Sequence, residues 1–401
     1  MSTRVMRSML KLKMYPANNG DAFLINANGN HLLVDAGYAS TYTDYIAQDL
    51  AELSRAGERL SLVVCTHIDA DHIGGLLGFF SANGGPGSRG IEVDAVWHNS
   101  LRSLPYPPTG PGQIEDARVL EAIRRRGFPI PAELAVDPIG ARQGSSLAKL
   151  IKSQGYRWNF GDGSRCIDRS CAALDLPNAV QIEVLGPSIE RLESLRTLWL
   201  QEMQKLGYRG TGQGSELVDD AYEMWCAHAA RQPASPSAQP IAANKDLALA
   251  EVYTADTRIA NGSSIALLLT AGQSSVLLLG DAWAEDMVHE LKQRQADAGI
   301  QLFDAIKVSH HGSHHNTSVE LLALVDAPCF LISTNGTRHG HPDFAVLAAI
   351  VDRPAPFERK IYFNYETAAS RRLRAYSSKS GARFSVHVVE GEWIQLGEAQ
   401  P

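Results

Sequence analysis

The sequence predicts an α/β (α+β) fold in which two β-sheets pack face to face and helices cover their outer faces. Two observations support this prediction. Strand-like runs and amphipathic helical segments are mixed along the 401-residue chain, and each half contains one hairpin pattern. Polar residues also stand directly after strand-like runs, which is typical of a fold that builds a site along one rim of a sheet. These residues are Asp35, His67, His98, Asp281, His310 and His341.

The first half of the chain contains a hairpin, a helix and two further strands. Residues 21–27 and 31–35 alternate between apolar and polar side chains around an Asn-Gly-Asn turn. Apolar residues recur at helical spacing over 42–53, and this pattern predicts a helix. The apolar runs at 60–66 and 93–97 predict two strands, of which the first is buried.

Regular patterning weakens between residues 101 and 260. We interpret the chain as one domain, 1–401, and residues 101–260 as a family-specific insertion within it rather than a separate domain. In this region we expect helices over 114–126, 147–154 and 188–203, a strand over 180–185 and a Pro-rich loop over 231–241.

Regular patterning returns at residue 264 and continues almost to the end of the chain. The alternating run at 383–389 predicts an edge or outer strand. Before it we expect a hairpin of 265–269 with 276–279, a helix over 284–295 and strands over 303–309, 329–333 and 360–363.

The composition is that of an ordinary globular protein, with 44% hydrophobic and 20% charged residues. The net charge of −7 argues against a protein that coats nucleic acid or an anionic membrane with its whole surface. The arginine runs at 124–126 and 371–374 can still form a local basic groove, although such runs are more often solvated. Neither a signal peptide nor an apolar run of roughly 20 residues is evident. We therefore expect a cytoplasmic protein with no membrane partner.

The five cysteines include no Cys-x-x-Cys pair, which argues against a zinc–thiolate site. Cys65 and Cys329 stand in apolar strand-like runs and are expected to be inert core residues. Cys166 and Cys171 are expected to pair only in an exported protein.

Two histidines and two aspartates occur within six residues, directly after the predicted buried strand at 60–66. A Gly-Gly pair follows and allows a tight turn into a helical apolar pattern. The alternative is an ordinary solvated loop, but such a loop does not need His and Asp at alternating positions beside a buried strand. The motif therefore predicts a site for one or two divalent cations. Its ligand-type residues are His67, Asp69, Asp71 and His72.

Several short motifs resemble the metallo-β-lactamase superfamily and occur in its order. The resemblance covers about 15–100 and 260–365 and skips the middle of the chain. It implies a four-layer αββα sandwich with a long insertion and a metal-dependent hydrolase. The motifs are Gly20-Asp21-Ala22 with Leu33-Val34-Asp35-Ala36-Gly37, His67-x-Asp69-x-Asp71-His72, Leu279-Gly280-Asp281, His310-His311-Gly312-Ser313 and Gly340-His341-Pro342.

The metal motif departs from the commonest superfamily pattern, His-x-His-x-Asp-His, because Asp69 stands at the second histidine. With the His-His-Gly-Ser and Gly-His-Pro motifs, this form is most similar to the hydrolase domain of the ComEC competence proteins. This chain lacks the membrane channel that accompanies that domain, so the resemblance implies a fold and a chemistry but no role in DNA uptake. A carboxylate in place of an imidazole favours oxygen-loving ions, and we expect two divalent cations, manganese or zinc.

The resemblance also implies which residues hold each cation. It assigns His67 and Asp69 to one cation and places Asp281 between the two. The second cation would be held by Asp71 and His72.

The other candidates each have two interpretations. We expect His311 to complete the second metal site and His310 to face the substrate, although one of the two can simply pack. His341 is expected to donate a hydrogen bond or a proton to the substrate, and its alternative is a plain helix-entry turn. His98 takes the place of the family's third motif as a metal ligand, and its alternative is a partly buried histidine beside a tryptophan. Asp35 is expected to be structural.

These assignments predict a phosphodiesterase, and more specifically a nuclease, in which Asp71 orients an activated water. The expected partner is nucleic acid or a small phosphodiester. One alternative is hydrolysis of a lactone, a β-lactam or a phosphocholine ester. The other is a binding or signalling module with a vestigial metal site. The sequence defines neither the substrate nor the oligomeric state.

Overall fold

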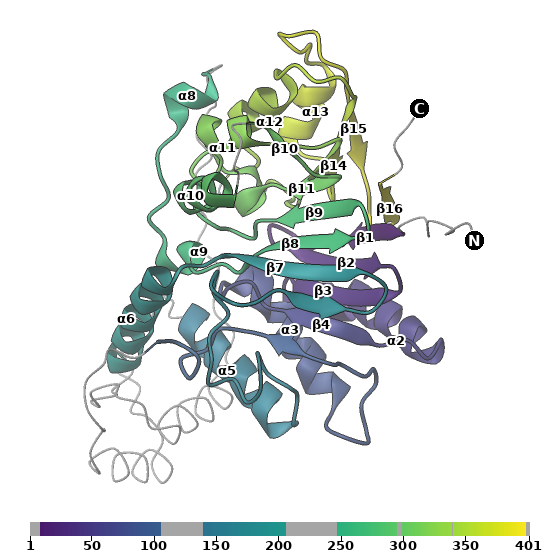
Figure 1. The fold of residues 1–401 in the computed structure, drawn as a ribbon, viewed down its shortest axis with the longest axis vertical. Helices are drawn as coiled ribbons and strands as arrows, with labels where there is room; N and C mark the ends of the chain where they lie inside the picture. Colours follow the sequence, from purple (N-terminus) through teal and green to yellow (C-terminus); the bar gives the residue numbers. More distant parts are fainter. Residues whose placement is uncertain (1–8, 106–138, 206–246, 295–298, 339, 398–401) are drawn as a thin grey trace.

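The computed structural model describes residues 9–105, 139–205, 247–294, 299–338 and 340–397. Two large β-sheets stack at the centre, and helices lie on the outer side of each (Figure 1). The predicted mixed α/β fold with two packed sheets is confirmed.

The first sheet has six strands and contains the N-terminal hairpin. Strands β2 and β3 pair antiparallel, whereas β3, β4 and β5 run parallel to one another. The carboxyl ends of these three parallel strands therefore meet at one rim of the sheet. In sheet order the strands are β16 (Trp393–Leu396), β1 (Leu10–Met14), β2 (Ala22–Ala27), β3 (Asn30–Ala36), β4 (Leu60–Val64) and β5 (Val96–Trp97).

The second sheet has eight strands. Strands β6 to β9 pair antiparallel, and β9, β11, β13, β14 and β15 are parallel. In sheet order they are β15 (Phe384–Val388), β14 (Arg359–Phe363), β13 (Cys329–Ile332), β11 (Ala305–Lys307), β9 (Ser274–Leu278), β8 (Ala266–Ala271), β7 (Val180–Gly186) and β6 (Leu174–Leu176). Strands β10 (Gln301–Leu302) and β12 (Val325–Asp326) form a small separate pair.

Helices form the two outer layers. The six-stranded sheet is covered by α1 (Ala39–Thr41), the π-helical turn η1 (Tyr42–Ile46), α2 (Ala47–Arg55), α3 (Ala70–Asn83) and α5 (Ile139–Ser153). The eight-stranded sheet is covered by α10 (Ala284–Arg294), α11 (Val319–Leu324), α12 (Phe344–Val351) and α13 (Ala368–Arg374). The remaining helices are α6 (Ile189–Lys205), α8 (Leu249–Val252), α9 (Ile259–Gly262) and the 3-10 turn η2 (Ser309–Gly312).

Three large apolar clusters follow this layering. One fills the space between the sheets, where Phe23 and Leu32 of the first sheet share a cluster with Leu267 and Leu331 of the second. The other two lie between each sheet and its helices. Because side chains alternate across a strand, one face of each strand supplies the central layer and the other supplies an outer layer.

Most predicted elements are present with small shifts at their ends. The two predicted hairpins are β2–β3 and β8–β9, and β15 is an edge strand as expected. Strand β7 belongs to the region predicted as an insertion, yet it pairs with β8 inside the eight-stranded sheet. The short strands β1, β6, β10, β12 and β16 were not predicted. The predicted helix at 114–126 and loop at 231–241 lie outside the described residues.

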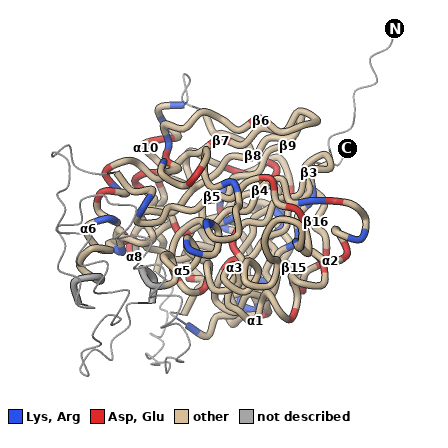
Figure 2. The backbone as a smooth tube through the Cα atoms, turned by 90° about the horizontal axis from the view of Figure 1, so that it is seen from below, with Lys and Arg blue, Asp and Glu red and all other residues tan. Residues whose placement is uncertain are grey.

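Positive and negative residues are interspersed along the described chain (Figure 2). The 371–374 arginine run lies on α13, where Arg371 and Arg374 pair with Glu366 and Arg372 stacks on Phe344. The 124–126 run lies outside the described residues. Cys65 and Cys329 are buried, as expected, and both are free thiols. Within the described ranges, no helix combines the length and the apolar character needed to cross a membrane.

Candidate metal centre

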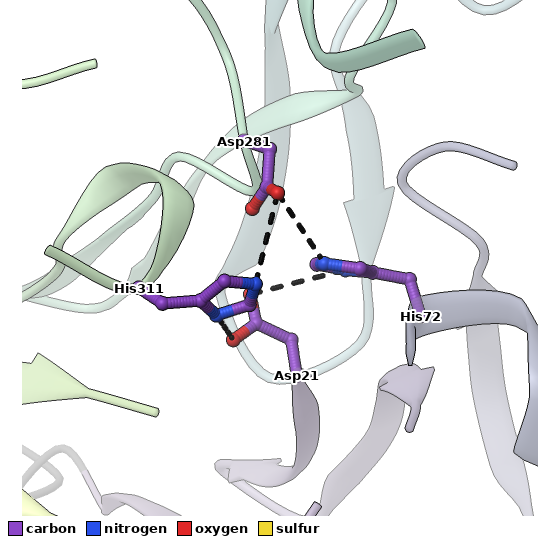
Figure 3. A group of neighbouring side chains, drawn as sticks. All are labelled: Asp21, His72, Asp281 and His311. Atoms are coloured by element: carbon purple, nitrogen blue, oxygen red, sulfur yellow. Dashed lines mark ion pairs between the residues drawn. The ribbon is translucent and has the colours of Figure 1, made fainter. Parts of the chain in front are cut away.

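The candidate residues gather where the rims of the two sheets meet. His67 follows β4, and Asp71 and His72 lie in the first turn of α3. Asp281 follows β9, and His311 lies in η2, after β11. Figure 3 shows His72, Asp281 and His311 converging from separate segments of the chain. The parallel pairing of β3 with β4 and of β9 with β11 places these strand ends side by side.

One carboxylate oxygen, Oδ2 of Asp281, is the centre of this cluster. Four histidine Nε2 atoms lie 3.5–3.8 Å from this oxygen, and these distances are too long for good hydrogen bonds. They approach the ligand–ligand spacing of about 3.4 Å expected when metal–ligand bonds are about 2.1 Å long. The imidazole Nε2 atoms lie at 3.5 Å for His72, 3.7 Å for His311 and 3.8 Å for both His67 and His310.

Several ring nitrogens at this centre are buried without a hydrogen-bond partner. Among them are Nε2 of His67, His72 and His311. Leaving a buried polar atom unsatisfied costs about 1–3 kcal/mol, so three in one place call for a shared partner. A divalent cation is such a partner, because neutral imidazole nitrogen is its common protein ligand.

In His67, His72 and His310 the opposite ring nitrogen, Nδ1, is held by an oxygen acceptor. Donation from Nδ1–H fixes the tautomer that leaves the Nε2 lone pair free for a cation. The same arrangement on three rings is the pattern of supporting contacts around metal-binding histidines. The acceptors are Thr66 Oγ1 for His67 (3.1 Å), Asp35 Oδ2 for His72 (2.8 Å) and Asn316 Oδ1 for His310 (2.7 Å). Nδ1 of His311 lies 3.3 Å from Asp21 Oδ1, but neither atom has a hydrogen-bond partner among the described residues.

Two further carboxylates divide the cluster into two parts. Asp69 Oδ2 lies 3.9 Å from Nε2 of His67, and Asp71 Oδ2 lies 3.8 Å from Nε2 of His311. Asp281 contacts both parts. The structure therefore brings together all the predicted ligands except His98.

Asp21 and Lys307 are site residues that the predicted ligand set omits. Lys307 is buried, forms an ion pair with Asp21, and donates to the Gly280 carbonyl at 2.7 Å. Its Nζ is also 3.6 Å from Oδ1 of Asp281. Asp21, drawn in Figure 3, pairs with Lys307 through Oδ2, whereas its Oδ1 is buried without a hydrogen-bond partner among the described residues. Its carboxylate lies close enough to His72, Asp281 and His311 to hold a cation together with them. The sequence signal for Lys307 was a lysine inside the apolar run at 303–309.

Burial and mutual attraction shift the ionisation of these groups in opposite directions. Burial lowers the pKa of His67 and of His310 to about 4, which keeps both rings neutral and able to bind a cation. Burial also opposes the charged form of His72, but Asp281 and Asp35 hold its pKa well above the ordinary value. Burial would raise the pKa of Asp281, yet the histidines around it hold that pKa well below its usual range.

The fixed charges of the site also fit two cations. The carboxylates are Asp21, Asp35, Asp69, Asp71, Asp256 and Asp281, and Lys307 and Arg258 supply two positive charges among them. Four negative charges therefore remain, which two divalent cations would balance. Buried charge without a counter-charge is strongly unfavourable, so the balance supports a site for two cations rather than one.

The backbone at this site takes conformations that L-residues adopt rarely. His310 and His311 have φ angles of 45° and 57°, and Gly312 follows at 84°. These consecutive left-handed residues turn both imidazoles toward Asp281. Asp35 also has a positive φ, 53°. Such strain persists where the surrounding contacts enforce it, and it is common at functional sites.

The structure places His98 and His341 differently. The His98 ring bonds the Gly144 carbonyl through Nε2 at 3.0 Å and stacks on Trp158, and burial lowers its pKa to about 4. The structure thus does not bring His98 into the cluster, and its geometry matches the alternative of a hydrogen-bonded histidine beside a tryptophan. His341 does lie near the site, with its ring 5.1 Å from that of His310.

Replacing Asp35 with Asn should weaken cation binding without removing a ligand. Oδ2 of Asp35 accepts from His72 Nδ1 at 2.8 Å and from Thr66 Oγ1 at 2.6 Å, so an amide NH₂ there would oppose two donors. The His72 ring would then carry its proton on Nε2 and lose its free lone pair. We expect metal affinity to fall about 10–100-fold. Calorimetric titration checks this, with Asp94→Asn, at an exposed ion pair with Arg59, as the control. Unchanged affinity in Asp35→Asn would contradict the support role.

A comparison with known protein families finds a match over part of the chain. Residues 15–145 match the profile of the metallo-beta-lactamase superfamily. No curated protein matches the chain.

Solved structures with some likeness to the chain include the metallo-beta-lactamase fold protein YhfI from Bacillus subtilis. It is 11% identical with a TM-score of 0.38, over 96% of this chain and 99% of that one. A variant of the β-hydroxylase CmlA is 12% identical with a TM-score of 0.34, over 97% of this chain and 54% of its own. A protein of unknown function from Enterococcus faecalis V583 is 9% identical with a TM-score of 0.28, over 95% of this chain and 77% of its own. Residues 15–145 are thus similar in sequence to the metallo-β-lactamase superfamily, and the two stacked sheets between helices are consistent with its sandwich fold.

Proposed function

We propose that this protein is a phosphodiesterase that uses two divalent cations. The observation that carries the proposal is the convergence of four imidazole Nε2 atoms on Oδ2 of Asp281, with two further carboxylates beside them. Unsatisfied buried nitrogens, fixed tautomers and the charge balance all fit a pair of cations.

The geometry suggests how the residues divide between the cations. His67 and Asp69 would hold the first, with Asp281 between the two. The second would be held by Asp71, His72 and His311. His310, which we expected to face the substrate, has its Nε2 as close to Asp281 as that of His67. It is therefore suited to complete the first site.

The protein residues around the centre have defined tasks. Asn19 Nδ2 donates to Asp71 Oδ2 at 2.6 Å, and this contact fixes the carboxylate that would orient the attacking water. His341 is placed by Asp343, 3.3 Å from its Nδ1, and would donate a proton to the departing oxygen. When bound, the two cations supply a water of lowered pKa and neutralise charge on the phosphate.

Asp69 favours phosphodiesters over carbonyl substrates. A third carboxylate makes the centre harder and more negative than a centre with histidine there, which suits Mn²⁺ and similar ions. The similarity of the motif set to the ComEC hydrolase domain points the same way. Nucleic acid and small phosphodiesters are both substrates of this class.

Purified protein with Mn²⁺ or Zn²⁺ should hydrolyse DNA, RNA or bis(p-nitrophenyl) phosphate. Asp71→Ala should lower the rate at least about 100-fold, because an orienting acid–base group contributes that much or more. Elemental analysis should find two cations per chain.

Absence of hydrolysis of all three substrates with any divalent metal would end the proposal. Activity confined to a lactone, a β-lactam or a phosphocholine ester would instead favour the second chemistry. Less than one cation after supplementation would favour a binding module.

A further inference from the structure

The side chain of Arg258 lies at the open side of the candidate metal centre. Its Nη2 is 3.1 Å from Oδ2 of Asp69, the same oxygen that faces His67. The Arg258 side chain is 53% exposed and that of Asp69 is 19% exposed, whereas His67 is fully buried. The guanidinium group therefore stands between solvent and the ligands of the first cation.

The backbone of Arg258 is fixed by contacts that also serve the site. Its N–H donates to Oδ1 of Asp256 at 2.9 Å, and its carbonyl accepts from Nε1 of Trp283 at 3.2 Å. The other oxygen of Asp256 accepts from Asn316, whose Oδ1 in turn holds the ring of His310. One hydrogen-bonded unit thus positions both Arg258 and His310.

Stability alone does not account for an arginine at this place. An ion pair as exposed as Arg258–Asp69 contributes little to the folded state. A phosphodiester, however, is an anion and must approach the carboxylates of Asp69 and Asp71. A positive group on the open side reduces the electrostatic repulsion between the phosphate and these carboxylates. A guanidinium group can also donate to two phosphate oxygens at once.

We propose that Arg258 binds a non-bridging oxygen of the substrate phosphate beside the first cation. The inference rests on the proposed phosphodiesterase function and adds a residue that no motif singled out. Charge that builds on this oxygen during attack is stabilised by a donor already in place.

Arg191 provides a matched control from the same neighbourhood. Its guanidinium lies over the Trp283 ring at 4.1 Å, so it shares a contact residue with Arg258. Its Nε and Nη2 bind Asp286 at 2.8 and 2.9 Å. A carboxylate therefore already fills the fork that a phosphate would need.

The test compares the wild type, Arg258→Ala, Arg258→Lys and Arg191→Ala. Three quantities are measured: hydrolysis of bis(p-nitrophenyl) phosphate, calorimetric binding of inorganic phosphate to the Mn²⁺-loaded protein, and Mn²⁺ content. In Arg258→Ala we expect kcat/KM to fall about 100-fold and phosphate affinity to fall at least about tenfold, with Mn²⁺ content unchanged. Arg258→Lys should be intermediate, and Arg191→Ala should stay within about twofold of the wild type.

Two outcomes would overturn the inference. One is unchanged phosphate affinity in Arg258→Ala. The other is loss of Mn²⁺ in parallel with activity, which would make Arg258 a support for Asp69 instead. If the wild type hydrolyses no phosphodiester, the proposed function fails, and the phosphate titration still decides whether Arg258 binds the anion.

Discussion

Asp281→Asn should bind neither cation tightly and should hydrolyse substrate at least about 1,000-fold more slowly than the wild type. Oδ2 of Asp281 is the atom that both parts of the centre share, with four ring nitrogens within 3.8 Å. Asn keeps the shape of the side chain but removes the charge, so neither cation would keep its shared anionic ligand. Metal content after dialysis and the rate with bis(p-nitrophenyl) phosphate measure the two effects.

The control for Asp281→Asn is Asp286→Asn, a few residues further along the chain on α10. Asp286 pairs with Arg191 and has no part in the proposed centre. Circular dichroism of both variants shows whether the fold is retained. Two tightly bound cations in a folded Asp281→Asn protein would contradict the bridging role.

Gly75→Ala should destabilise the protein by about 3 kcal/mol and displace the start of α3. A Cβ at Gly75 would lie 2.0 Å from the carbonyl oxygen of Ala36, at the end of β3. Neither backbone can yield easily, because Gly75 N–H also donates to the Gly37 carbonyl at 2.8 Å. The helix preference of alanine, worth about 1 kcal/mol, offsets only part of the clash. Chemical denaturation measures the loss, and weaker cation binding should accompany it because His72 lies on the same turn.

Gly78→Ala, on the same helix, separates the clash from the helix preference. The three atoms nearest to a Cβ there all belong to the Tyr42 side chain, the closest at 3.0 Å, and a side chain can shift where a backbone cannot. We expect its free energy of unfolding to stay within about 1 kcal/mol of the wild type. Equal effects of the two substitutions would mean that the close approach of α3 to β3 does not set the stability.

Local patterns were enough to predict the layers of the fold. The hairpin patterns at 21–35 and 265–279 and the buried strand at 60–66 depend on periodicity within a few residues, and all three are present. The short strands β1 and β16 were missed because they form a sheet edge only through each other and β2. No local pattern specifies a partner almost four hundred residues away in the sequence.

The site residues that are close together in the sequence could be predicted. Those whose role depends on tertiary contacts were harder to predict. The alternating positions of His67, Asp69 and Asp71 are enough to predict a metal site. His98 has the right position after a strand, but the sequence does not show that its ring bonds Gly144. The role of Lys307 was not predicted because a buried lysine is stable only beside carboxylates, and these come from other segments of the chain.

The ring nitrogens around Asp281 come from both sheets, so a cation held there ties distant parts of the chain together. His72 follows the six-stranded sheet and His311 the eight-stranded one, and only the folded chain presents them together. A cation bound there would therefore shift the folding equilibrium toward the folded chain, by about 2.7 kcal/mol at one hundred times the dissociation constant. Depletion of the metal would remove this tie between the two sheets, and the amount of folded protein would then depend on metal supply, as the reaction rate does.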